Sequence, residues 1–200
     1  MVLLSIVPVG SISDCPFSRF MKYFTKEIWA GHNSRSDVEM QRAFEQGKQN
    51  SEEYARQLKQ LECRLSEKAY RFFTAESLHD GRLLAFTAGD SIGHDIQGSE
   101  KFDINVHNVS VEMKVLGSSL DVLYTLRYEK VRKVLFDYPS DEPLFHHEGG
   151  HIGDWGYDEL TANDVNYLQH EVLFASGTTI LIEFKEFSYE RVEFEGTRYI

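Results

Sequence analysis

Apolar and polar positions follow two different periods along this chain of 200 residues. A long helical stretch is predicted from Asp37 to about Phe73, and in its second half the apolar residues recur every three or four positions, which is the spacing of one helix face. The remaining positions alternate in charge, as on an exposed helix surface. The apolar stripe in the second half of this stretch predicts a face that docks on the rest of the fold, and it consists of Tyr54, Leu58, Leu61, Leu65, Ala69 and Phe72.

Polar residues mark where the helices are expected to begin. Thr25 precedes a short helical pattern and can cap it. Ser36 and Glu39 have the spacing of a capping box, which predicts the start of the long helical stretch. Gly47 and Asn50 are unfavourable inside a helix, so we expect them to divide this stretch into two helices.

A period of two dominates after Asp80-Gly81, a dipeptide typical of turns. The run Leu120–Tyr128 alternates clearly, and Gly117–Ser119 is expected to join it to the preceding run as a hairpin. Strands that follow one another without helices between them form antiparallel sheets. The sequence therefore predicts an α+β fold, with a helical N-terminal third followed by an antiparallel β-rich domain.

A second hairpin is expected near the end of the chain. The apolar runs Tyr167–Phe174 and Thr179–Phe187 flank Ala175–Thr178, which has the composition of a turn. Arg191–Phe194 is expected to add an edge strand.

These patterns divide the chain into an N-terminal extension (1–20), a helical segment (21–77) and the β-rich domain (78–200). Met1–Gly10 is apolar, but it lacks a preceding basic region, contains Pro8 and is too short to span a bilayer. We therefore expect neither a signal peptide nor a membrane span. An alternative natural start is Met21, in which case residues 1–20 are a misassigned upstream stretch.

The net charge of −11 is concentrated in the β-rich domain, where residues 74–200 include 23 acidic and 10 basic side chains. A field of this sign repels nucleic acids and anionic lipids, so we expect neither as a partner and favour a basic protein. Cys15 and Cys63 are too few for a disulfide framework or a thiolate zinc site, which favours a reducing, cytoplasmic location. The sequence does not indicate an oligomeric state.

One segment matches a catalytic motif. In His147-Glu148-Gly149-Gly150-His151, two histidines have the spacing that binds zinc on a helix, and Glu148 would activate the bound water. Only helical phase makes the two imidazoles converge, and each glycine destabilises a helix by about 1 kcal/mol relative to alanine. We therefore predict a loop that matches by coincidence, without catalytic residues, metal or cofactor. The alternative is a zinc-dependent hydrolase with His147 and His151 as ligands.

A candidate interaction patch precedes the last hairpin. Trp155 and Tyr157 lie next to Asp158 and Glu159 in the sequence, so the four can form aromatic anchors with an acidic rim. The competing interpretation is that the two aromatic residues close one end of the core.

Several short segments together resemble a bacterial family of uncharacterised proteins, found mainly in Bacillus-like organisms. Met21–Glu27 (MKYFTKE) is similar to the opening of these proteins, and Leu78–Asp80 to their entry into a β-rich half. Trp155–Glu159 and the hairpin His170–Thr178 are similar as well. The resemblance covers residues 21–195, implies the same layout and favours the later start, but it implies no activity.

A looser similarity links the chain to small bacterial toxin-immunity proteins, which have comparable sheet entries and acidic surfaces. Taken with the charge, this similarity favours a non-catalytic soluble protein that binds a macromolecule through its acidic β-domain. An immunity-like inhibitor of a basic toxin is one form that such a protein can take.

The zinc alternative has a direct test. Tag-free protein purified without chelator is expected to contain no stoichiometric zinc by elemental mass spectrometry, because two glycines disfavour the required helix. About one zinc per chain, lost when His147 and His151 are both replaced by alanine, would instead establish the metal site.

Overall fold

The computed structural model describes residues 21–90, 109–138 and 152–194. Its helices come first, and they are α1 (Lys26–His32), α2 (Asp37–Gln60) and α3 (Glu67–Ala75). The strands follow, and they are β1 (Arg82–Asp90), β2 (Val109–Leu116), β3 (Val122–Glu129), β4 (Lys133–Asp137), β5 (Trp155–Ala162), β6 (Leu168–Phe174), β7 (Thr179–Phe184) and β8 (Glu186–Glu193). All strand pairings are antiparallel, which confirms the α+β prediction.

The helices begin where the polar residues predicted. Thr25 occupies the N-cap position of α1, and the Ser36 hydroxyl accepts a hydrogen bond from the Glu39 backbone N–H at 3.5 Å at the start of α2. The prediction of a break near Gly47 and Asn50 was wrong, because α2 continues through both. Tertiary contacts explain this, since Gly47 packs on a neighbouring ring and the Asn50 amide donates to a backbone carbonyl 2.6 Å away.

The break comes later, between Leu61 and Leu65. Leu65 has an extended backbone, and Ser66 then caps α3 by accepting a hydrogen bond from the Ala69 N–H at 3.1 Å. The apolar stripe continues across this break, and all six of its residues pack in the main core. The stripe is therefore a docking face, as predicted, shared by two helices.

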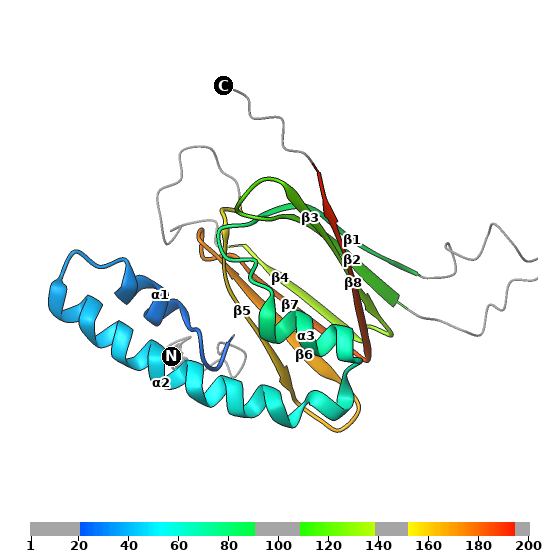
Figure 1. Ribbon diagram of the computed structural model, residues 1–200, viewed down its shortest axis with the longest axis horizontal. Coiled ribbons are helices and arrows are strands. Elements are labelled where there is room, and N and C mark those ends of the chain that lie inside the picture. Colours follow the sequence, from blue (N-terminus) through cyan, green and yellow to red (C-terminus); the bar gives the residue numbers. More distant parts are fainter. Residues whose placement is uncertain (1–20, 91–108, 139–151, 195–200) are drawn as a thin grey trace, which may run out of the picture.

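The strands form two four-stranded sheets with the orders β1-β2-β3-β8 and β4-β7-β6-β5 (Figure 1). The hairpin β2-β3 turns at Gly117–Ser119 and the hairpin β6-β7 turns at Ala175–Thr178, which confirms both hairpin predictions. The final strand lies at the edge of the first sheet beside β3, again as expected, although it already begins at Glu186.

One predicted strand is in fact two. The run Thr179–Phe187 divides at Lys185, whose backbone N–H bonds to the carbonyl of Glu129 at 3.2 Å. The chain crosses there from β7 in the second sheet to β8 in the first. The core-facing positions shift by one residue there, from Ile180, Ile182 and Phe184 to Phe187 and Tyr189, and both sets pack in the same core.

The main core lies between the two sheets, and α3 closes one end of it. The Phe72 ring of α3 contacts Phe187 and Tyr189 of β8, with centroids 5.2 and 4.8 Å away. Helix α2 covers the edge of the second sheet, because its Tyr54 hydroxyl accepts the N–H of Leu160 in β5 at 2.9 Å. A covered edge strand is protected from pairing with another chain.

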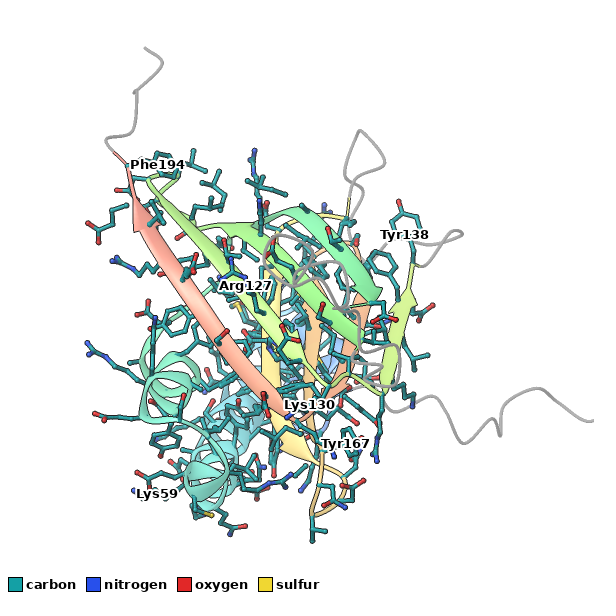
Figure 2. All side chains as sticks on the ribbon, turned by 90° about the vertical axis from the view of Figure 1, so that its right-hand side faces the viewer. Lys59, Arg127, Lys130, Tyr138, Tyr167 and Phe194 are labelled. Carbon is teal, nitrogen blue, oxygen red and sulfur yellow. The ribbon has the colours of Figure 1, made fainter. Side chains whose placement is uncertain are left out.

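The first sheet has a polar outer face, which Figure 2 shows with Arg127 near its centre. Arg127 bonds to Glu112 on one neighbouring strand at 3.0 Å and to Glu190 on the other at 2.8 Å. Such exposed pairs contribute about 0–1 kcal/mol each. Within the described ranges, no helix combines the length and the apolar character needed to cross a membrane.

Gly156 allows α1 to pack closely on β5. An added Cβ would lie 2.9 Å from both the Trp29 ring and the Leu173 carbonyl oxygen. Gly156→Ala is therefore expected to lower the free energy of unfolding by about 1–3 kcal/mol, measured by urea denaturation. Gly89→Ala is the matched control, since nothing lies within 4 Å of its added Cβ. Equal effects of the two changes would contradict this account.

Candidate functional site

The His147–His151 motif lies outside the described residues, so the zinc hypothesis stays a prediction. Within the part of the chain that the structure describes, no three His, Cys, Asp or Glu side chains are placed to share a metal ion.

The four residues of the candidate patch lie on opposite sides of β5. Trp155 is fully buried in the core, and its indole N–H donates to Asp158 at 2.9 Å. Asp158 also contacts the buried His170 ring at 3.2 Å, and the other nitrogen of that ring bonds to the Tyr128 hydroxyl at 2.7 Å. Trp155 therefore closes the core, and these polar groups satisfy one another inside it.

Tyr157 and Glu159 face the other side of the second sheet, toward the N-terminal segment and α1. Tyr157 packs edge-on against Trp29, with centroids 5.0 Å apart, whereas the Glu159 side chain is completely buried. A bulge between Trp155 and Tyr157 shifts the strand register at this point. The four residues thus do not form one exposed surface.

Two buried carboxylates hold the segment that leads into α1. Glu159 accepts hydrogen bonds from the backbone N–H groups of Lys22, Tyr23 and Phe24, at 2.8 Å for Tyr23 and 3.4 Å for Phe24. Glu171 on β6 accepts the N–H of Met21 at 2.6 Å. Consecutive N–H groups of this kind form a concave anion-binding nest, here filled by the protein's own carboxylate.

Burial and mutual repulsion disfavour the charged forms of these two groups. Burial raises the pKa of Glu159, the backbone N–H groups lower it, and the neighbouring Glu171 raises it further. Burial likewise raises the pKa of Glu171, against hydrogen bonds from Met21 and Gln169 that lower it. In both cases desolvation has the larger effect, so each pKa lies above its ordinary value.

A third buried carboxylate on the same side of the second sheet, that of Glu183, has positively charged partners. Glu183 on β7 pairs with the Arg132 guanidinium at 2.5 Å and lies 3.8 Å from the Lys133 ammonium. The described donors to Glu159 and Glu171 are backbone N–H groups and the Gln169 amide, all of them uncharged. Among the described residues, Glu159 and Glu171 thus form no ion pair within 4 Å, although Lys133 lowers the pKa of Glu171 from a greater distance.

Glu171 also lines a cavity of about 610 Å³ beside the start of α1. The wall is formed by Met21, Lys22, Tyr23, Thr25, Glu27, Gln57, Thr161, Ala162, Asn163, Gln169 and Glu171. The Gln169 amide donates to Glu171 and accepts from Asn163, which connects the carboxylate to a hydrogen-bonded wall. The Gln57 carbonyl oxygen is buried without a hydrogen-bond partner among the described residues.

Besides Lys22, the wall contains the carboxylates of Glu27 and Glu171 and the buried Gln57 oxygen, which are acceptors for a donor-rich, positively charged group. Sequence reasoning identified Glu159 but missed Glu171, Gln169 and the cavity. Polar Gln169 and Glu171 alternate with apolar Leu168 and Val172, a pattern typical of a strand with one solvated face. The sequence therefore contains no signal that all seven residues of β6 would be buried.

The chain matches no protein-family model, and no curated protein or solved structure gives a significant match. The resemblance to a bacterial family therefore stays a prediction based on short motifs.

The raised pKa of Glu171 and the lowered pKa of Glu190 predict opposite effects of pH on the free energy of unfolding. The raised pKa of Glu171 means that its contribution to stability is present below the ordinary value of 4.5 and is lost as the pH rises through the raised pKa. Glu171→Gln should therefore become more stable relative to the parent as the pH rises above about 4.5, measured by urea unfolding at a series of pH values.

Glu190→Gln is the control for this series. A hydrogen bond from Arg127 lowers the pKa of Glu190, so that carboxylate contributes stability above 4.5 that is lost at lower pH. This variant should become less stable relative to the parent as the pH rises. Identical pH profiles for the parent and Glu171→Gln would contradict the proposed environment of Glu171.

Proposed function

We propose that this protein is a non-catalytic binding protein whose acidic β-domain holds a positively charged side chain of a basic partner protein. The observation that supports this proposal is the pair of buried carboxylates, Glu159 and Glu171, of which Glu171 opens into the polar cavity. A buried negative charge is costly unless a cation compensates it. A ligand ammonium group placed in the cavity would supply that compensation.

The lining favours an ammonium over a neutral ligand. A lysine side chain brings three N–H donors on a compact head, and the wall offers acceptors at Glu171, Gln57 and Gln169. The cavity is also large enough for a lysine side chain, since ligand pockets typically begin at about 300 Å³.

The charge of the whole domain agrees with this choice of partner. The excess of acidic residues in positions 74–200 attracts a basic protein from a distance and accelerates its encounter. A buried carboxylate then provides the specific contact. An immunity-like inhibitor that covers a basic toxin is one concrete form of this function.

The proposal is tested with a defined cationic probe. Nα-acetyl-lysine methylamide is expected to bind in the millimolar range and to shift the backbone NMR signals of residues 21–25, 161–163 and 169–171. The Nε-acetylated form of the same probe has lost its charge and should not bind. Glu171→Gln should weaken binding roughly tenfold, since a hydrogen bond to a charged group contributes about 1.5–3 kcal/mol.

Two controls make this test decisive. Glu190→Gln removes an equal charge from the exposed face of the first sheet and should bind the probe as the parent does. Equal affinity for the charged and the acetylated probe, or equal weakening by both substitutions, would overturn the proposal. NMR spectra of each variant without probe establish that it is folded.

A further inference from the structure

A second cavity, of about 410 Å³, lies at the other end of α1 and shares no lining residue with the first. Its wall combines aromatic rings with carboxylates, and it consists of Trp29, His32, Asn33, Phe44, His79, Asp80, Asp154, Tyr157 and Ala175. The contributing segments are the end of α1, the first half of α2, the turn before β1, and the one end of the β5-β6 pair where β5 begins and β6 ends.

The rings are held in fixed positions. Trp29, His79 and Tyr157 contact one another, with centroid separations of 5.0 to 5.9 Å. The His32 ring bonds to the Tyr157 hydroxyl at 2.8 Å and is tilted by 32° to the Phe44 ring, with centroids 4.6 Å apart. Phe44 remains 55% exposed, so a ligand can reach it from solvent.

The carboxylates are positioned by the backbone. Asp80 has a left-handed conformation with φ of 62°, and its N–H bonds to the Trp155 carbonyl at 2.8 Å. The Trp155 N–H returns a bond of 2.7 Å to the carbonyl of Gly81, which fixes the turn next to Asp154. The Asp80 carboxylate lies 3.1 Å from the His79 ring, and the Asp154 carboxylate lies 3.5 Å from the Arg82 guanidinium. Exposed pairs of this kind are weak.

From this combination we infer that the second cavity binds the guanidinium group of an arginine side chain on the partner. A guanidinium is planar and weakly hydrated, stacks on aromatic rings and directs five N–H donors toward carboxylates. An ammonium is compact and strongly hydrated, and it matches the polar first cavity better. The inference extends the proposed function to a different set of residues and does not depend on Glu171.

The test follows the two tryptophan indole N–H signals by NMR. Nα-acetyl-arginine methylamide should shift the signal of Trp29, which lines the cavity, with saturation in the millimolar range. The signal of Trp155, which is buried in the core, should stay in place. The citrulline counterpart has nearly the same shape without the charge, and it should shift neither signal.

Single substitutions test the aromatic rings and the carboxylates of the second cavity separately. Phe44→Ala should weaken arginine binding about threefold, in line with about 0.5–1 kcal/mol for an exposed cation–π contact. Asp154→Asn should weaken it roughly tenfold, because a charge-assisted hydrogen bond is lost. Phe136→Ala removes a ring on β4 that is 46% exposed, close to the 55% of Phe44, and should have no effect.

Three results would overturn the inference: equal shifts with arginine and citrulline, no shift of the Trp29 signal at any arginine concentration used, or unchanged affinity in both cavity variants. Glu171→Gln should bind arginine as the parent does. Failure of this inference therefore leaves the lysine proposal standing, and failure of the lysine proposal leaves this one testable.

Discussion

The arrangement of the whole molecule depends on the burial of the second sheet on both faces. Every residue of β6 and β7 is buried, although their side chains alternate between the two sides. One side packs on the core between the sheets. On the other side the N-terminal segment and α1 cover β5 and β6, and this cover turns Glu159 and Glu171 from surface groups into buried ones. Backbone N–H groups can satisfy these carboxylates but cannot neutralise them, and this imbalance is the physical basis of the candidate site.

The sequence predicted the elements that depend on local patterns. The helix starts at Thr25 and Ser36, the apolar stripe and both hairpin turns are encoded within a few residues of where they lie, although the Thr25 side chain makes no capping hydrogen bond among the described residues. The position of the helix break was not predictable in this way. Gly47 and Asn50 are poor helix residues by propensity, yet both are held by contacts with α1 and the segment before it. Tertiary contacts here outweigh a propensity of about 1 kcal/mol or less.

The candidate site was harder to predict because its contacts are distant in sequence. Met21 and Glu171 are separated by 150 positions, and Lys22 and Glu159 by 137. The sequence placed Glu159 in an acidic rim, which is the usual environment of a glutamate. No local pattern showed that the N-terminal segment would lie over it. The crossing at Lys185 was missed for a different reason, since the one-residue shift of phase between Phe184 and Phe187 is also what an irregularity within a single strand produces.

The two cavities gain significance from their positions relative to each other. They lie at opposite ends of α1, and their lining residues Phe44 and Gln57 are 13 positions apart in α2, about 20 Å at 1.5 Å per residue. An extended peptide spans this length in about six residues. In the complex that we propose, a basic partner with a lysine and an arginine at that separation would engage both cavities at once. Two weak sites that are occupied together bind far more tightly than either alone, because the second contact forms within the complex. Recognition would then depend on the spacing of two positive charges, which a general attraction between opposite charges cannot provide.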